Sequence, residues 1–228
     1  MKEIIVPIVP SAITRFIWPA LVFLALVFPV MPSPAFAHPH VWVTMRSELV
    51  YAADGSVTGI RHAWTFDDMF SAYATQGIEQ KQKGTFTREE LAPLAEVNVA
   101  SLKEYDYFNY ARIDGKRQKG TFSDPIDYWL DYADSILTLR FTLPFKAPVR
   151  AQDLEISLFD PEFFIDFSFE EKDPVKLVGA PAQCELTLVR PNDSAFPSSQ
   201  RLDKNFQASE AFAGMGSRFA NKVLVTCP

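Results

Sequence analysis

The stretch Ala35-Phe36-Ala37-His38-Pro39-His40-Val41-Trp42-Val43 divides the chain into two parts of different character. Ala35-x-Ala37 is the small-x-small pattern found before signal-peptidase cleavage sites. A basic start precedes an apolar run over residues 16–30, which prolines interrupt and which is short for a membrane span of ~20 residues. We therefore expect residues 1–37 to be a cleaved signal peptide and the mature, periplasmic protein to begin at His38. An uncleaved anchor is the alternative.

The mature part is long enough for one domain with a sizeable core, spanning residues 38–228. Aromatic residues make up 14% of the chain and fall with valines in short runs, which favours strands. The formal net charge is −6 and no basic cluster is present. Because phosphate contacts need patches of Lys and Arg, the composition argues against a nucleic-acid partner.

A β-hairpin is predicted directly after the cleavage site. Residues 41–51 alternate between apolar and polar side chains, Ala53-Asp54-Gly55-Ser56 is a turn signal, and residues 57–66 return as the partner strand. If Asp54-Gly55 is the two-residue turn, the numbers of paired residues add up to about 109. This register places His62 opposite Ser47 and Trp42 opposite Asp67.

A helical insertion is predicted over residues 68–104. Asp67-Asp68 can cap a first helix through Met69 and Phe70. Thr87-Arg88-Glu89-Glu90 is a capping box that opens a second helix. The β pattern then resumes, with strands expected at 107–113, 116–122, 128–132, 136–143, 154–159, 163–169, 175–178, 184–189 and 222–227. The expected fold is mainly β, a sandwich or open barrel of short antiparallel strands with a two-helix insertion.

Both cysteines, Cys184 and Cys227, lie in the last quarter of the chain. In an exported protein such a pair is expected to form one disulfide. A thiol metal site is the alternative, but it requires further ligands nearby and no histidine lies in that region.

The mature N-terminus is the candidate metal site. The free amine and the imidazoles of His38 and His40 are nitrogen ligands suited to nickel, cobalt, zinc or copper. Pro39 has no amide N–H, which argues against the square-planar motif that binds metal through deprotonated peptide nitrogens. The hairpin register brings Asp67 close to His40 as a fourth ligand, with Asp68 as its substitute. The alternative is a frayed terminus with two solvated histidines.

His62, the third histidine, lies roughly 23 Å along the hairpin from His40 at 3.3 Å per strand residue. It shares a face with Trp64 and Phe66, so a packed or surface histidine is expected rather than a ligand. Asp160-Pro161-Glu162-Phe163-Phe164-Ile165-Asp166 places carboxylates beside a turn, where they suit either a site or the turn itself; the turn is favoured.

The segment from Glu79 to Glu90 has the frame of an EF-hand loop, with Gly84 at its sixth position and Glu90 at its twelfth. Positions three and five, normally Asp or Asn, are Lys81 and Lys83. Two ammonium groups repel Ca²⁺, so we interpret the segment as a degenerate loop and expect no calcium. Nucleophile and phosphate-loop motifs are absent from the sequence, which favours a protein that is not an enzyme.

Several segments together resemble the bacterial domain-of-unknown-function 1007 family. They are His38-Pro39-His40-Val41-Trp42, Trp64-Thr65-Phe66-Asp67, Tyr105-Asp106-Tyr107-Phe108, Phe159-Asp160-Pro161 and Phe219-Ala220-Asn221…Val225-Thr226-Cys227-Pro228. The resemblance implies an exported soluble protein of the kind labelled as the periplasmic component of an uncharacterised ABC-type transport system, often associated with nickel/cobalt-type permeases. His38, His40 and Asp67 fall on the recurrent motifs, whereas Lys81 and Lys83 depart from an acidic segment that is common in the family.

Together these observations favour an exported metal-binding accessory of transition-metal transport or homeostasis, partnered by an inner-membrane metal permease or ABC transporter. Two alternatives come from other classes. One is a copper-brace redox enzyme built on the N-terminal histidine. The other is a metal-free module that binds a membrane permease through its aromatic surface.

Overall fold

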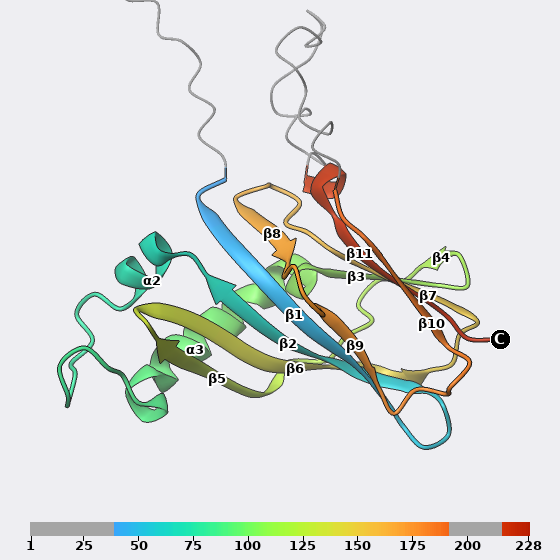
Figure 1. Ribbon diagram of the computed structural model, residues 1–228, viewed down its shortest axis with the longest axis horizontal. Coiled ribbons are helices and arrows are strands. Elements are labelled where there is room, and N and C mark those ends of the chain that lie inside the picture. Colours follow the sequence, from blue (N-terminus) through green and yellow to red (C-terminus); the bar gives the residue numbers. More distant parts are fainter. Residues whose placement is uncertain (1–38, 192–215) are drawn as a thin grey trace, which may run out of the picture. The chain divides into compact units, whose positions relative to one another are not determined.

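The computed structural model describes residues 39–191 and 216–228 (Figure 1). The expected signal peptide and His38 lie outside these residues. The prediction of a mainly β fold is confirmed, since the described chain forms two sheets and neither closes into a barrel. The first sheet has the order β5-β6-β2-β1-β8, with β9 also paired to β1; the second has the order β10-β11-β7-β3-β4.

The strands of the first sheet are β1 (Val41–Tyr51), β2 (Val57–Phe66), β5 (Ile126–Ala133), β6 (Ile136–Val149), β8 (Ile165–Phe169) and β9 (Val175–Val178). Those of the second are β3 (Asn109–Ile113), β4 (Lys116–Arg117), β7 (Asp153–Leu158), β10 (Glu185–Val189) and β11 (Asn221–Thr226). The predicted strand positions are therefore largely confirmed, although β4 is much shorter than the expected strand over 116–122.

The predicted register of the first hairpin is correct. Ser47 pairs with His62, and the backbone N–H of Asp67 donates to the carbonyl of Trp42 at 3.0 Å. Burial alternates strictly along β1, so one face of the sheet enters the core and the other faces solvent. A shift by one residue would turn this apolar set to the solvent, which is why the alternation specifies the register.

The turn of this hairpin is longer than predicted. The N–H of Gly55 donates to the carbonyl of Ala52 at 3.0 Å, and the N–H of Ala52 donates to Ser56 at 2.8 Å, so three residues form the loop. Gly55 has a φ of +82°, as the left-handed last position of such a loop requires. A bulge at Thr58 then restores the predicted register between Val50 and Gly59.

Two strand pairings differ in direction from the all-antiparallel expectation. Both β8 and β9 run parallel to β1, with Val41 opposite Ile165 and Ser47 opposite Val175. β1 is long enough to pair with both, one after the other. Alternation along a strand reports which face is buried but not the direction of its neighbour, so the sequence pattern carries no signal for this feature.

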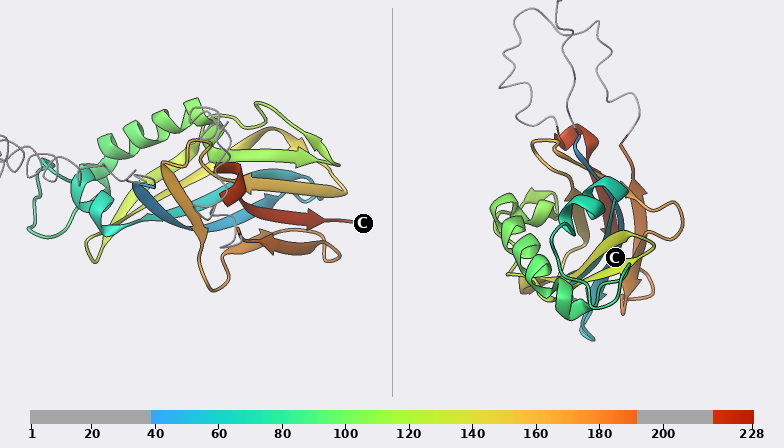
Figure 2. Two further views of the ribbon diagram at one scale, coloured as in Figure 1. Left: turned by 90° about the horizontal axis from the view of Figure 1, so that it is seen from above. Right: turned by 90° about the vertical axis from the view of Figure 1, so that its left-hand side faces the viewer.

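The two-helix insertion is confirmed as α2 (Asp68–Ala74) and α3 (Arg88–Leu102), followed by the 3₁₀ segment η1 (Lys103–Phe108). Asp67 caps α2, and Thr87 with Glu90 forms the predicted capping box of α3. Figure 2 shows α3 along one flank of the sheets, where it contacts β5 and buries Leu91, Ala95 and Val99. Among the described residues, no helix is long and apolar enough to cross a membrane.

The core is centred on Trp64 of β2, which is only 2% exposed. Its ring lies 4.9 Å from those of Phe141 on β6 and Phe167 on β8, both edge-on, and 6.5 Å from Phe108. Edge-to-face aromatic contacts of this kind add stabilisation to the apolar area that they bury. Trp64 thus links the first sheet to the segment that follows α3.

The cysteines form the expected disulfide between Cys184, before β10, and Cys227, after β11. We expect Cys184→Ala/Cys227→Ala to lower the free energy of unfolding by about 4 kcal/mol, because the bond closes a loop of 43 residues in the unfolded chain. Urea unfolding measures this difference. Dithiothreitol should shift the wild-type transition and leave that of the double variant in place; equal stability of the two proteins would contradict the prediction.

Candidate functional site

The start of β1 holds the described histidine of the predicted metal site. The backbone N–H groups of His40 and Val41 donate to the carbonyl of Phe164, at 2.9 and 3.3 Å, which fixes the strand's first residues against the loop before β8. His40 and Trp42 lie on the exposed face, and Trp42 is 46% exposed. The imidazole of His40 lies 4.9 Å from the ring of Phe164. The start of β1 and the loop before β8 therefore hold His40 at one end of the first sheet.

Asp67 lies next to Trp42, as the register predicts, but both of its oxygens accept backbone hydrogen bonds. Oδ2 accepts from the N–H of Trp42 at 2.9 Å, and Oδ1 accepts from the N–H of Phe70 at 2.8 Å. The carboxylate thus joins the first strand to the N-terminus of α2, where a negative charge is stabilised. Asp68 follows as the first residue of α2, and its Oδ1 accepts from the N–H of Met69 at 2.8 Å.

A second carboxylate flanks Trp42 from the opposite strand. Asp166 of β8 pairs with Trp42 in parallel register. The carboxyl group is about half-buried, and burial raises its pKa. The sequence placed Asp166 near a turn but could not predict that it pairs with Trp42, because that pairing depends on the parallel alignment of β8 with β1.

The described residues do not complete a metal site by themselves. Within 39–191 and 216–228, no group of three or more His, Cys, Asp or Glu side chains is arranged to hold a metal ion. His40 and Asp67 are brought to the same end of the first hairpin. His38 and the amine of the processed chain, which the prediction requires, lie outside the described part.

The EF-hand-like segment keeps the turn and uses its last carboxylate internally. Glu90 accepts the backbone N–H of Lys81 at 2.8 Å and that of Thr87 at 2.7 Å. These two backbone hydrogen bonds lower the pKa of Glu90, and the bond from Thr87 has the larger effect. Gly84 takes a φ of +85°, as expected for the sixth position. Glu90, at the twelfth position where an EF-hand loop has its bidentate calcium ligand, thus links the loop to the start of α3.

Asp160 is a buried turn residue, as the favoured interpretation holds. The residue is only 3% exposed. Oδ1 accepts from the N–H of Glu162, and Oδ2 accepts from those of Phe164 and Ile165, all at 2.9 Å. Because Phe164 in turn holds His40, Asp160 sets the position of the loop that supports the candidate site.

His62 is a packed histidine, 4% exposed, inside the sandwich. Its Nδ1 lies 2.9 Å from the hydroxyl of Ser47, and its ring packs 5.0 Å from that of Phe141. Burial lowers the pKa of His62 to about 3, an effect that Asn109 partly offsets. Asn109 belongs to β3 of the second sheet, so His62 lies where the two sheets face each other. At neutral pH the imidazole of His62 is therefore uncharged and packs as part of the core.

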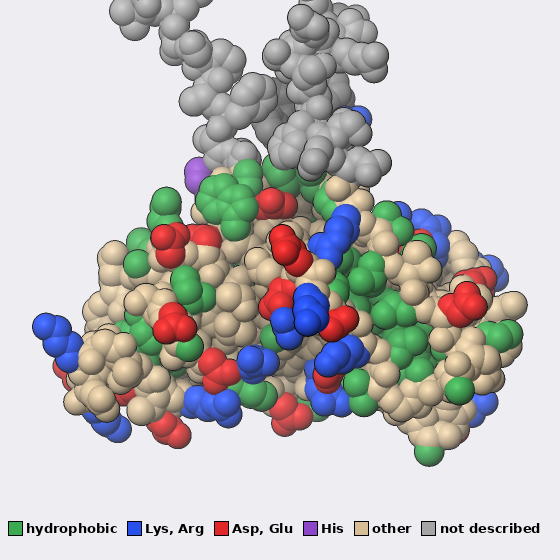
Figure 3. Space-filling model, in the orientation of Figure 1, with side chains coloured by type: hydrophobic (Ala, Val, Ile, Leu, Met, Phe, Trp, Pro, Cys, Tyr) green, Lys and Arg blue, Asp and Glu red, His purple; other side chains and the backbone are tan. Residues whose placement is uncertain are grey.

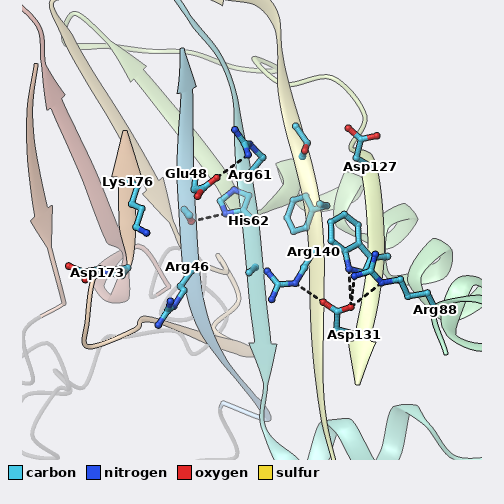
Figure 4. A pocket seen from close by; sticks show the side chains of 16 residues that line it. Arg46, Glu48, Arg61, His62, Arg88, Asp127, Asp131, Arg140, Asp173 and Lys176 are labelled. Atoms are coloured by element: carbon cyan, nitrogen blue, oxygen red, sulfur yellow. Dashed lines mark hydrogen bonds and ion pairs between the residues drawn. The ribbon is translucent and has the colours of Figure 1, made fainter. Parts of the chain in front are cut away.

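The exposed face of the first sheet carries a charged groove of about 590 Å³ that the sequence analysis did not find. Figure 4 shows Asp131 between Arg140 and Arg88, and Glu48 beside Arg61. The ion pairs of Asp131 with Arg140 and Arg88 measure 2.6 and 3.0 Å, and that of Glu48 with Arg61 measures 3.1 Å. Figure 3 shows acidic and basic side chains interleaved across this face. The charges largely compensate one another. Strand order brings them together from distant parts of the sequence, which is why spacing did not reveal them.

Comparisons with known proteins give one family and one relative. The family described as "Protein of unknown function (DUF1007)" matches residues 23–227. An uncharacterised 15.5 kDa protein in the trpE 3′ region of Spirochaeta aurantia is 30% identical over 95 residues, which are 41% of this chain and 66% of that protein. The aligned part therefore spans just under two thirds of the relative's own length.

Proposed function

The chain belongs to the family of unknown function DUF1007, and on that premise we propose that it is an exported, non-enzymatic metal-binding protein that serves transition-metal transport or homeostasis. The observation that carries the proposal is the placement of His40. Its backbone N–H is hydrogen-bonded to Phe164, and the residue is exposed. Trp42, the next residue on the same face of β1, is flanked by Asp67, directly after β2, and by Asp166 on β8. An inner-membrane metal permease or ABC transporter is the proposed recipient of the ion.

The proposed ligand set combines described residues with the processed N-terminus. The amine of the mature chain and the imidazoles of His38 and His40 supply three nitrogens, which suit nickel, cobalt, zinc or copper. Asp67 supplies an oxygen from a position fixed by two backbone N–H groups. Such outer hydrogen bonds orient a metal-binding carboxylate and leave further lone pairs for an ion. The disulfide suits an oxidising compartment, which supports export to the periplasm.

Calorimetric titration of the protein starting at His38 with Ni²⁺, Co²⁺, Zn²⁺ and Cu²⁺ tests the proposal. We expect one ion per chain, and an affinity that falls by at least about 100-fold in His38→Ala/His40→Ala, since two of three nitrogen ligands are removed. One extra residue before His38 should weaken binding as well, because it displaces the amine. Thr44→Ala, on the exposed face of the same strand, is the matched control. Binding that survives both changes contradicts the proposed site.

A second candidate function is a metal-free module for a membrane permease. Four large apolar side chains are exposed at the end of the sandwich that carries His40: Trp42 at 46%, Phe164 at 45%, Met69 at 70% and Tyr73 at 72%. Exposed apolar side chains that cluster are a mark of interaction surfaces. A flat metal titration together with permease cross-linking that Trp42→Ala abolishes would favour this candidate over metal binding.

A further inference from the structure

The outer face of the second sheet carries a small hollow of about 180 Å³ over β3, β7 and β11, which are neighbouring strands in Figure 1. Strand pairing explains its floor. Ser157 of β7 pairs with Tyr110 of β3 on one side and with Lys222 of β11 on the other. Directly opposed residues project from the same face, so a short side chain between two long ones leaves a depression in the surface. The hollow is therefore positioned by the sheet and not by a loop.

Three cations and one carboxylate surround the hollow. They are Arg112, Arg117, Lys222 and Glu155, a local net charge of +2 in a chain whose formal net charge is −6. Glu155 already serves two of the cations, because its carboxylate lies 3.2 Å from the ammonium of Lys222 and 3.6 Å from Nε of Arg112. It also accepts a hydrogen bond from the hydroxyl of Ser157 at 3.0 Å. Among the described residues no second carboxylate lines the hollow, so positive charge is in excess there.

Arg117 is the cation without a carboxylate. Within residues 39–191 and 216–228, no Asp or Glu forms an ion pair with it. Its guanidinium lies instead over the ring of Tyr110, 5.9 Å from the ring centre. Arg117 is also directly opposite Arg112 in the pairing of β4 with β3, and like charges in opposed positions destabilise a sheet. An anion bound between the two guanidiniums would remove this repulsion.

The donors at the hollow suit a phosphate group. Arg112 donates one N–H to the carbonyl of Gly115 at 3.1 Å and faces Glu155 through Nε, which leaves part of its guanidinium unused. The side chain of Arg117 makes no hydrogen bond to a described residue. Guanidinium groups bind phosphate and carboxylate through two parallel N–H bonds. A local charge of +2 is balanced by a phosphate dianion, whereas a carboxylate or a phosphodiester carries a single negative charge.

We propose that this hollow binds a phosphate dianion, either the free ion or the terminal group of a small monoester. Arg112 and Arg117 donate to its oxygens, and Lys222 adds positive charge from the other side of the hollow. The site belongs to the second sheet and shares no residue with the metal site proposed at the start of β1. Either proposal can therefore fail without the other.

Inorganic phosphate, methyl phosphate and dimethyl phosphate test the class of ligand. At pH 7.5 the first two are mainly dianions, whereas the third is a monoanionic diester like those of lipid headgroups and nucleic acids. Each is titrated at constant ionic strength into ¹⁵N-labelled protein starting at His38, and the arginine Nε–H signals are followed. We expect both dianions to shift the signals of Arg112 and Arg117. The signal of Arg61 should stay in place, although its side chain on the first sheet has the same 49% exposure as that of Arg112.

The affinities then identify the source of the phosphate. Dimethyl phosphate should bind at least about fivefold more weakly than the dianions, because it leaves one positive charge unbalanced. Equal affinity for inorganic and methyl phosphate assigns the site to a terminal phosphate group, and a preference for inorganic phosphate assigns it to the free ion. The proposal is overturned if neither dianion shifts the Arg112 and Arg117 signals, or if the diester binds as tightly as the dianions.

Two pairs of variants separate the hollow from the general charge of the surface. Arg117→Gln should weaken phosphate binding at least about fivefold, since it removes charge-assisted hydrogen bonds. Lys116→Gln is its matched control, because this neighbour is also exposed and carries the same charge but does not line the hollow. Arg112→Gln and Arg61→Gln form the second pair. Exposed substitutions of this kind leave the fold intact. Equal weakening by the two members of each pair would mean that only overall charge matters and would overturn the site.

Discussion

Acidification from pH 7.5 to pH 5 is expected to lower the free energy of unfolding by about 2 kcal/mol through His62 alone, and by about 4 kcal/mol at pH 3. The folded protein keeps His62 neutral because burial lowers its pKa from 6.5 to about 3. The unfolded chain regains the ordinary pKa and binds a proton. The stabilisation is therefore complete above pH 6.5 and is lost as the pH falls toward 3.

Urea unfolding of wild type and His62→Gln between pH 7.5 and pH 5 isolates this effect. Gln is uncharged and keeps a polar group near Ser47 and Asn109, so the variant should be less stable at pH 7.5 but lack the His62 contribution to the pH dependence. The window lies above the ordinary pKa range of carboxyl groups, and the exposed His40 is common to both proteins. Parallel stability curves over this window would show that His62 is not buried in the neutral form.

The first hairpin shows which features a sequence pattern can predict. Alternation along residues 41–51 predicted the first strand, and the turn signal with residues 57–66 predicted its partner. The assumed two-residue turn at Asp54-Gly55 predicted that Ser47 faces His62, as the structure shows. The details of the turn were wrong by one residue, yet a bulge at Thr58 restored the register. Burial of one face is a stronger constraint than turn type, because a slip exposes every apolar side chain of the strand. The capping box of α3 was equally predictable, since it depends on neighbouring residues alone.

Features that depend on the pairing of distant strands could not be predicted from the sequence. Asp166 reaches Trp42 only because β8 runs parallel to β1. Arg88 and Asp131 meet because α3 begins beside β5, an edge strand of the first sheet. A run of left-handed backbone that begins at Asp106 contains no glycine and so carries no local signal. The hydrogen-bond acceptor role of Asp67 was foreseen as a helix cap, but its second bond to Trp42 depends on the pairing of β1 with β2.

Asp160→Ala is expected to lower the free energy of unfolding by about 3 kcal/mol or more and to loosen the support of His40. One buried carboxylate accepts three backbone hydrogen bonds, from Glu162, Phe164 and Ile165. Hydrogen bonds to a charged group are worth about 1.5–3 kcal/mol each, and donors left unpaired in a buried loop add a desolvation penalty. Loss of the carboxylate also frees the turn, in which Phe163 has a φ of +57°.

Two further variants and a local measurement separate this effect from general destabilisation. Asp160→Asn keeps a carbonyl acceptor and should cost less than Asp160→Ala, whereas Glu162→Ala, on an exposed neighbour, should change stability by less than about 0.5 kcal/mol. Amide exchange of His40 and Val41 should quicken in Asp160→Ala more than that of Thr44 on the same strand, because their shared acceptor is the carbonyl of Phe164. Uniform acceleration along β1, or full protection of His40, would contradict a role of Asp160 in holding the start of the strand.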